Sequence, residues 1–138
     1  MTTPRDAEQR RRFRDVYGRP RPAVYDAVEE KVLGAAWGAN GYTTKAQADM
    51  LLARLELQPG QLLLDVGTGR GWPGLYLAAR SGCRLLGTDI PVDALRSARN
   101  RAGMEAIAEH VALVAASGAA PPLRAGIVDG VVHTDVVC

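Results

Sequence analysis

The 138-residue sequence contains only two cysteines, Cys83 and Cys138, which have neither the number nor the spacing of a metal cluster or a disulfide framework. We expect both to be reduced, partly buried thiols. No apolar run approaches the roughly 18 residues that a membrane-spanning helix needs. The sequence also begins with polar and basic residues and lacks the apolar segment of a secretory signal. These absences predict a cytoplasmic protein with no metal site and no membrane contact.

The remaining composition is that of an ordinary globular protein, with 47% apolar and 23% charged residues. A chain of this length is expected to form one domain whose single core buries roughly 70% of the unfolded surface. No internal repeat divides it. Composition alone therefore predicts a soluble single-domain protein and says little about its activity.

The net charge is only +2, yet arginines crowd the first 21 residues. Such a basic arm could contact nucleic acid. However, Asp6, Glu8 and Asp15 interrupt the run, and no aromatic stacking platform accompanies it. We therefore interpret this segment as a solvated helix and predict no nucleic-acid partner. The arginines concerned are Arg5, Arg10, Arg11, Arg12, Arg14, Arg19 and Arg21.

Three helices are predicted before any strand, over residues 5–17, over residues 23–36, and from about residue 45 toward Pro59. Thr44 with Gln47 three residues later fits a capping box at the start of the third helix. Apolar spacing of three and four residues predicts the faces that pack on the core. These positions are Val24, Val28 and Val32 in the second helix and Met50, Leu51 and Leu55 in the third.

From Leu62 onward, short apolar strands alternate with helices, which is typical of a parallel sheet with right-handed crossovers. The predicted strands cover residues 62–66, 84–89, 111–115 and about 127–136. The predicted helices cover residues 73–81 and 92–102, and the second could resume after Gly103 as far as Glu109. Pro73 and Pro91 suit the first turns of these helices, and Gly82 suits a C-terminal cap.

A glycine-rich loop follows the first predicted strand, with Gly67, Gly69 and Gly71 at alternate positions. Glycines let a ligand approach the backbone, and the helix N-terminus behind the loop adds a favourable dipole. Asp65 stands at the carboxyl end of the strand, where ligands bind in open α/β sheets. Asp89, at the end of the next strand, can accept both hydroxyls of a ribose. The pattern predicts a nucleoside-cofactor site.

A second interpretation takes Gly69, Gly71 and Gly74 as a dinucleotide G-x-G-x-x-G, with Asp89 at about the expected 20-residue spacing. In that case the first glycine lies beyond the strand end, and Asp65 would point at the phosphates and repel them. We therefore favour an adenosyl sulfonium ligand over NAD.

The segment Asp65–Gly71 resembles motif I of the class I S-adenosylmethionine-dependent methyltransferases, and Gly87–Pro91 resembles their acidic second motif. Ala120–Leu123 followed by Val128–Val132 is similar to the loop and fourth-strand entry of the small-molecule branch often called type 11. The resemblance runs from about Gly41 to Cys138. It implies an α/β, Rossmann-like fold and S-adenosylmethionine as the cofactor.

The resemblance also implies a role for each motif residue. Asp65, Gly67, Thr68, Gly69 and Gly71 would surround the methionine part of the cofactor. Asp89 would hold the ribose and Ile90 would pack on the adenine. Ser117 stands where the family commonly carries an acidic residue near the adenine amino group, and a serine hydroxyl can still hydrogen-bond there.

The family fold has seven strands, whereas four are predicted here. We thus expect residues 1–60 to form a helical lead-in or lid and residues 61–138 to form the cofactor-binding half of a truncated methyltransferase domain. A non-catalytic remnant or interaction module stays an alternative, because the open sheet edge after the fourth strand could pair with another chain. An NAD-binding protein ranks last.

No catalytic residue is assigned, because methyl transfer from a sulfonium mainly needs alignment of donor and acceptor. His133 and Asp135 are the only candidate bases by position, and strand alternation would put them on one face. Tyr17, Trp37 and Tyr42 could face the sulfonium from the lid or simply pack the added helices. No Asn-Pro-Pro-Tyr-like element is present, so a small-molecule acceptor is preferred.

Overall fold

The structure is a computed structural model that describes residues 4–39 and 41–136. Its N-terminal helices are α1 (Pro4–Tyr17), α2 (Ala23–Leu33) and α3 (Lys45–Leu55). The elements that follow are β1 (Leu62–Val66), α4 (Gly74–Ser81), β2 (Arg84–Asp89), α5 (Val92–Met104), the short 3₁₀ helix η1 (Ala108–His110), β3 (Val111–Ala115) and β4 (Gly130–Val132). The bounds of the first three strands confirm the predicted ones.

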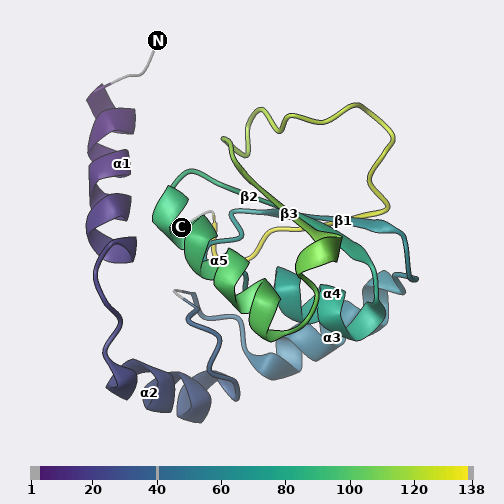
Figure 1. Cartoon of the computed structure of the whole chain (residues 1–138), viewed down its shortest axis with the longest axis horizontal. Coiled ribbons are helices and arrows are strands. Elements are labelled where there is room, and N and C mark those ends of the chain that lie inside the picture. The colour runs from purple at the N-terminus through teal and green to yellow at the C-terminus, as the bar shows by residue number, and fades with distance from the viewer. Residues whose placement is uncertain (1–3, 40, 137–138) are drawn as a thin grey trace.

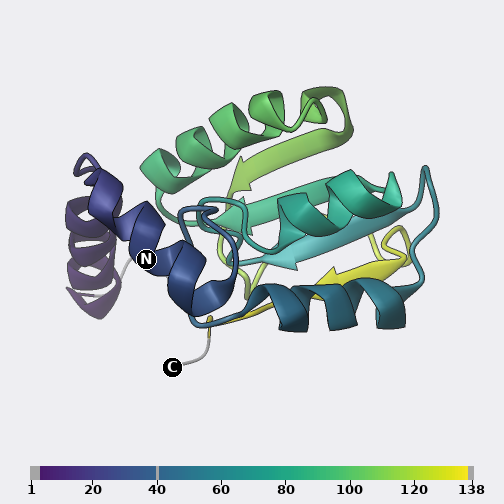
Figure 2. The ribbon, with the colours of Figure 1, turned by 90° about the horizontal axis from the view of Figure 1, so that it is seen from below.

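The four strands form one parallel sheet in the order β3-β2-β1-β4. Figure 1 shows α3, α4 and α5 on one side of this sheet and the connection from β3 to β4 on the other. Figure 2 shows that the strands point toward the end of the molecule where α1 and α2 lie. The predicted α/β architecture is confirmed, and α1 and α2 lie near the carboxyl ends of the strands, where ligands bind in such folds.

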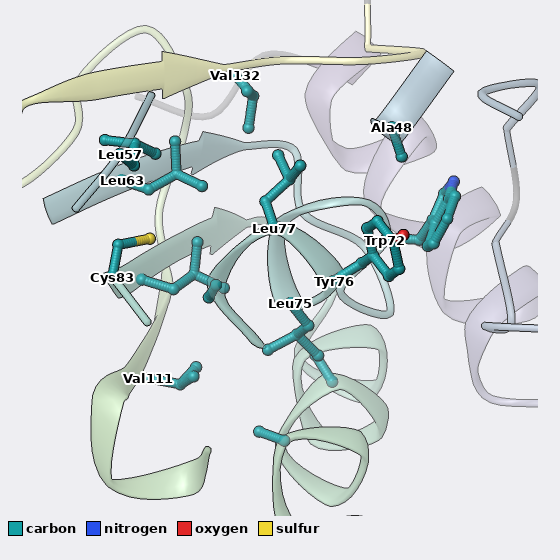
Figure 3. Packing of buried hydrophobic residues seen from close by; sticks show 14 residues of the cluster. Ala48, Leu57, Leu63, Trp72, Leu75, Tyr76, Leu77, Cys83, Val111 and Val132 are labelled. Carbon is teal, nitrogen blue, oxygen red and sulfur yellow. The ribbon is translucent and has the colours of Figure 1, made fainter. Parts of the chain in front are cut away.

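The core lies between the sheet and helices α3, α4 and α5 (Figure 3). Leu63 of β1 and Leu75 and Leu77 of α4 are fully buried, and Val132 of β4 joins them. Ala48 of α3 belongs to the same cluster, so the core includes residues on both sides of the predicted boundary at residue 60. Each buried leucine contributes about 1.5–3 kcal/mol. This packing holds β1 and α4 in place, and the glycine loop joins them.

Helix α2 differs from its prediction in length and in packing. It ends at Leu33 because Gly34 adopts a left-handed φ of 77° and its N–H caps the carbonyl of Glu30. The face formed by Val24, Val28 and Val32 is exposed at 64%, 54% and 64%, so the prediction that it packs on the core is wrong.

Helix α3 begins as predicted. Thr44 and Gln47 form the capping box, each side chain accepting from the other residue's backbone N–H. Leu51 and Leu55 pack against the core, whereas Met50 is 56% exposed and does not belong to the buried stripe. The helix stops at Leu55, before the predicted end near Pro59.

The segments around α4 and α5 also depart from expectation. Pro73 and Pro91 are the N-caps of α4 and α5, directly before the first turns, and Gly82 caps α4 as predicted. Helix α5 runs to Met104, but it does not resume to Glu109. Ala106 has a left-handed φ of 57°, which ends the helical backbone before η1.

Strand β4 covers Gly130–Val132 instead of the predicted 127–136. Just before its start, the backbone N–H of Asp129 donates to the carbonyl of Leu62, and the Asp129 carboxylate accepts from the N–H of Leu62. Beyond its end, Asp135 has a left-handed φ of 57° and its carboxylate binds Thr43. The carboxylates of Asp129 and Asp135 thus accept hydrogen bonds from Leu62 and Thr43 at the two flanks of the strand.

None of the helices within residues 4–39 and 41–136 combines the length and the apolar character needed to cross a membrane. A cytoplasmic location stays a prediction. Cys83 lies in the core with 1% of its surface exposed, and burial raises the pKa of its thiol. Cys138 lies outside the described residues.

Candidate functional site

The glycine loop after β1 folds back over the end of β2. The backbone N–H groups of Gly67 and Thr68 both donate to the carbonyl of Thr88, at 2.8 and 3.0 Å. Gly67, Gly69 and Gly71 have φ angles of 73°, 54° and 100°. Residues with a Cβ rarely adopt this left-handed backbone conformation, so the loop needs glycine at these three alternate positions.

Asp89 ties this loop to the second strand. One of its carboxylate oxygens, Oδ2, accepts from the backbone N–H of Gly69 at 2.7 Å, and Oδ1 accepts from the N–H of Ile90 at 2.7 Å. Burial raises the pKa of Asp89, and the two N–H donors partly offset this. The carboxylate is thus oriented toward the loop at the carboxyl end of β2.

Asp65 lies beneath the loop rather than in it. It is 1% exposed, and its Oδ2 accepts from Oγ1 of Thr68 at 2.8 Å. It also accepts from the backbone N–H of Gly74, at the start of α4. Burial, only partly offset by these bonds, raises the pKa of Asp65 to about 7. The side chain fixes the loop to the first turn of α4.

This placement removes one reason for rejecting a dinucleotide. The sequence suggested that Asp65 would point at the phosphates bound by Gly69, Gly71 and Gly74. In the structure the carboxylate is buried and faces Thr68 and Gly74 instead. Repulsion by Asp65 therefore does not distinguish NAD from an adenosyl sulfonium.

A small cavity of about 60 Å³ lies beside the loop. Of the predicted site residues, Gly67, Thr68 and Gly69 line it, together with Tyr17 of α1. Asp135 closes another side. Small-molecule pockets usually measure 300–1,000 Å³. In this conformation the space next to the loop is thus too small for a nucleoside.

Two neighbours take up this space. A Cβ at Gly67 would lie 2.5 Å from Cγ2 of Val136, so the end of the described chain packs directly on the loop. From the other side, the Tyr17 hydroxyl lies 3.4 Å from the position of a Cβ at Gly69. The segment after β4 and the end of α1 therefore narrow the cavity.

The structure places the other predicted site residues around this cavity rather than in its lining. Gly71 is buried, and a Cβ on it would collide with Leu75. Ile90 is half-buried next to Asp89. Ser117 is exposed, but the N–H of the preceding Ala116 donates to the carbonyl of Asp89 at 3.0 Å, so Ser117 follows at the same sheet edge.

The three candidate lid aromatics have different surroundings. Trp37 packs on Trp72 and Tyr76, with ring centroids 5.5 and 5.8 Å apart. Tyr42 is 84% exposed. Tyr17 lines the cavity, and the guanidinium carbon of Arg70 lies 5.0 Å from its ring centroid. Tyr17 is thus the aromatic residue of the three that lies beside the glycine loop.

Sequence reasoning missed Glu29. This residue of α2 is 5% exposed, and its carboxylate accepts from the backbone N–H groups of Trp37, Gly38 and Ala39 at 2.8–3.0 Å. It also pairs with Arg21. The contacts fix the segment that reaches the cavity at Ala39. No sequence signal marks it, since an acidic residue on a helix is normally solvated.

The residues after β4 are arranged differently from the prediction. His133 is exposed and lies beyond the end of the strand, so alternation does not put it on one face with Asp135. Instead, Oδ2 of Asp135 accepts from the N–H and Oγ1 of Thr43, at 3.1 and 2.8 Å. Within the part of the chain that the structure describes, no group of three or more His, Cys, Asp or Glu residues could hold a metal.

Comparison with known proteins places these features in a family. Residues 63–138, more than half of the chain, match the profile of a family described as "Methyltransferase domain". The chain is 33% identical over 63 residues to the methyltransferase GfsG of Streptomyces halstedii, covering 46% of this chain and 23% of that protein. It is 32% identical over 74 residues to phosphoethanolamine N-methyltransferase 1 of Zea mays, covering 52% and 14%.

A solved methyltransferase structure also resembles this chain. A geranyl diphosphate C-methyltransferase from Streptomyces coelicolor A3(2), in complex with Mg²⁺, geranyl diphosphate and S-adenosyl-L-homocysteine, is 26% identical with a TM-score of 0.62. The match covers 87% of this chain and 43% of that one. The chain therefore spans less than half the length of each of these relatives.

Proposed function

The chain belongs to the methyltransferase-domain family, and from this premise we propose that it binds S-adenosylmethionine and takes part in methyl transfer to a small molecule. The observation that carries the proposal is the hydrogen bond from Gly69 to Asp89, which joins the glycine loop to the end of β2. This pairing supports the predicted division of labour, in which the loop faces the methionine part and Asp89 the ribose.

The loop residues fit such a cofactor, although the present conformation leaves little room for it. The left-handed glycines leave the backbone open to a ligand, and each Asp89 oxygen has lone-pair capacity beyond its single N–H donor. Binding requires Val136 and Tyr17 to withdraw from Gly67 and Gly69, since these side chains take up the space. We extend the proposal to Ile90 and Ser117 on the adenine side.

When bound, S-adenosylmethionine supplies an activated methyl group, so the protein mainly has to align donor and acceptor. Tyr17 can contribute, because an aromatic ring beside a cation stabilises it by about 1–2 kcal/mol. No proton transfer is assigned to a residue of this chain. A small-molecule acceptor is supported by the relatives named for phosphoethanolamine and geranyl diphosphate.

A second function is supported by the sheet edge. The order β3-β2-β1-β4 places β4 at the edge, and Val131 on it is 54% exposed. Exposed edge strands pair with other chains. An interaction module that self-associates through β4 is therefore the alternative, and it predicts a dimer in sedimentation experiments.

Isothermal titration tests the first proposal. We expect saturable 1:1 binding of S-adenosylhomocysteine by a sample that circular dichroism shows to be folded, and weaker or no binding of NAD. Absence of S-adenosylhomocysteine binding by the folded chain would contradict the cofactor assignment. Binding of NAD in preference to S-adenosylhomocysteine would restore the dinucleotide interpretation.

A further inference from the structure

A second, larger hollow lies between α1 and α2, with a volume of about 760 Å³. This is within the range of small-molecule pockets. It shares one residue, Arg70, with the small cavity at the glycine loop. Because Arg70 stands between Gly69 and Gly71, a ligand in this hollow, here called the arginine groove, would lie next to the proposed cofactor site.

The groove is basic, because five arginines line it against two acidic residues, Glu8 and Asp15. Arg21 is already engaged by Asp26 and Glu29. Among the described residues, no ion pair involves Arg11, Arg12 or Arg19, the other groove arginines of α1 and the turn after it. The arginines that line the groove are Arg11, Arg12, Arg19, Arg21 and Arg70.

The groove also brings like charges together. Arg21 and Arg70 both line it, and burial and the neighbouring Arg21 guanidinium lower the pKa of Arg70, whereas Tyr17, Glu29 and Asp26 act in the opposite direction. An anion placed there would relieve the repulsion between guanidinium groups. Arginine offers paired N–H donors that match phosphate oxygens, and several arginines match a dianion better than a single carboxylate.

Apolar groups line the rest of the groove. Val16 and Tyr25 are 49% and 55% exposed, and Pro20 and Pro22 lie between them along the chain. A ligand with an apolar part would cover these side chains, since burial of apolar surface contributes about 25 cal/mol per Å². The groove is therefore suited to a molecule that is anionic at one end and apolar at the other.

From these features we infer that the arginine groove binds an organic phosphate with an apolar ester group, and that this molecule is the methyl acceptor. A lone pair of the acceptor would bond the methyl carbon as the carbon–sulfur bond of S-adenosylmethionine breaks, and S-adenosylhomocysteine would leave with that electron pair. Arg12 and Arg19 hold the phosphate, and Val16 and Tyr25 contact the apolar part. The role as acceptor rests on the proposed function, whereas the binding itself does not.

The test measures binding of n-octyl phosphate by isothermal titration at low ionic strength. We compare the wild type with Arg12→Gln/Arg19→Gln and with a matched control, Arg54→Gln/Arg124→Gln, which removes the same charge at exposed positions outside the groove. We expect 1:1 binding that weakens about tenfold or more in the groove variant, as expected for lost charged hydrogen bonds, and stays unchanged in the control. Inorganic phosphate should bind more weakly than n-octyl phosphate.

Equal loss in both variants, or no loss in either, would overturn the inference. So would displacement of n-octyl phosphate by single-stranded oligouridylate at an equal concentration, because the surface would then be a nucleic-acid site. Titration of S-adenosylhomocysteine in the same samples separates the two proposals. Its binding without n-octyl phosphate binding rejects only the groove, and the reverse result rejects the acceptor role.

Discussion

The backbone N–H of Gly69 donates a 2.7 Å hydrogen bond to Oδ2 of Asp89 and so joins two residues that are twenty positions apart. Asp89 stands at the end of β2, and Gly69 is the middle glycine of the loop after β1. Because β1 and β2 are neighbours in the sheet, a short loop is enough to bring them together. The bond therefore orients the carboxylate at the sheet edge where a nucleoside ligand is proposed.

Replacing this carboxylate should weaken cofactor binding. We expect Asp89→Ala to reduce the affinity for S-adenosylhomocysteine by about 10- to 100-fold, because a lost hydrogen bond to a charged group costs about 1.5–3 kcal/mol. Titration calorimetry measures the change. Glu109→Ala removes an exposed carboxylate in η1 and serves as the control. Unchanged affinity in Asp89→Ala would show that this residue does not hold the ribose.

Two glycines should respond in opposite directions to replacement by alanine. Gly71 has a φ of 100°, and a Cβ there would collide with Leu75, so Gly71→Ala should lower the free energy of unfolding by about 2 kcal/mol or more. Gly103 lies in α5 with no atom within 4 Å of the added Cβ. Gly103→Ala should therefore stabilise by about 0.5–1 kcal/mol. Urea unfolding measures both changes in the free energy of unfolding, and equal effects of the two substitutions would contradict the loop geometry.

The first three strands could be predicted to the residue because each is a short apolar run bounded by Gly, Pro or polar residues, and local pattern alone defines such strands. Strand β4 could not. Its ends depend on side-chain contacts of Asp129 with Leu62 and of Asp135 with Thr43, which join distant parts of the chain. Helical spacing likewise showed an apolar face on α2 but not whether another element covers it.

For the site, the glycine loop could be predicted because left-handed φ angles restrict these positions to glycine. Its partner Asp89 could be predicted from its place at the end of the next strand. The orientation of Asp65 was not, since the same strand-end position can face a ligand or the first turn of a helix. The burial of Glu29 was also unreadable, because it depends on a chain segment that folds back over α2.

The Glu29 carboxylate should control the order of the segment that it binds. We expect Glu29→Gln to destabilise the protein by about 1–3 kcal/mol, since charged hydrogen bonds to partly buried N–H groups are weakened and the ion pair with Arg21 is lost. Hydrogen exchange of the amides of Trp37, Gly38 and Ala39 should become faster. Glu30→Gln, on the exposed side of the same helix, is the matched control. Equally fast exchange in both variants would contradict this role.

Asp65 should make stability depend on pH. Its pKa is about 7 in the folded protein and ordinarily 3.8, so between pH 4 and pH 7 the folded state holds one proton more than the unfolded state. The free energy of unfolding must then fall as pH rises through this window, by up to about 4 kcal/mol, and level off above pH 7. Burial of Asp89 raises its pKa too and adds a contribution of the same sign.

Two substitutions separate Asp65 from Asp89. Asp65→Asn keeps the shape without the charge, so the variant's stability should depend less on pH between 4 and 7, and the difference from the wild type isolates the Asp65 contribution. Thr68→Val removes the O–H donor that favours the ionised form, so the fall in stability should continue to a higher pH than in the wild type. Urea unfolding over a pH series measures both effects. Parallel profiles of the wild type and Asp65→Asn would show that Asp65 ionises in the folded protein as freely as in the unfolded chain, and that its burial beneath the glycine loop is not maintained in solution.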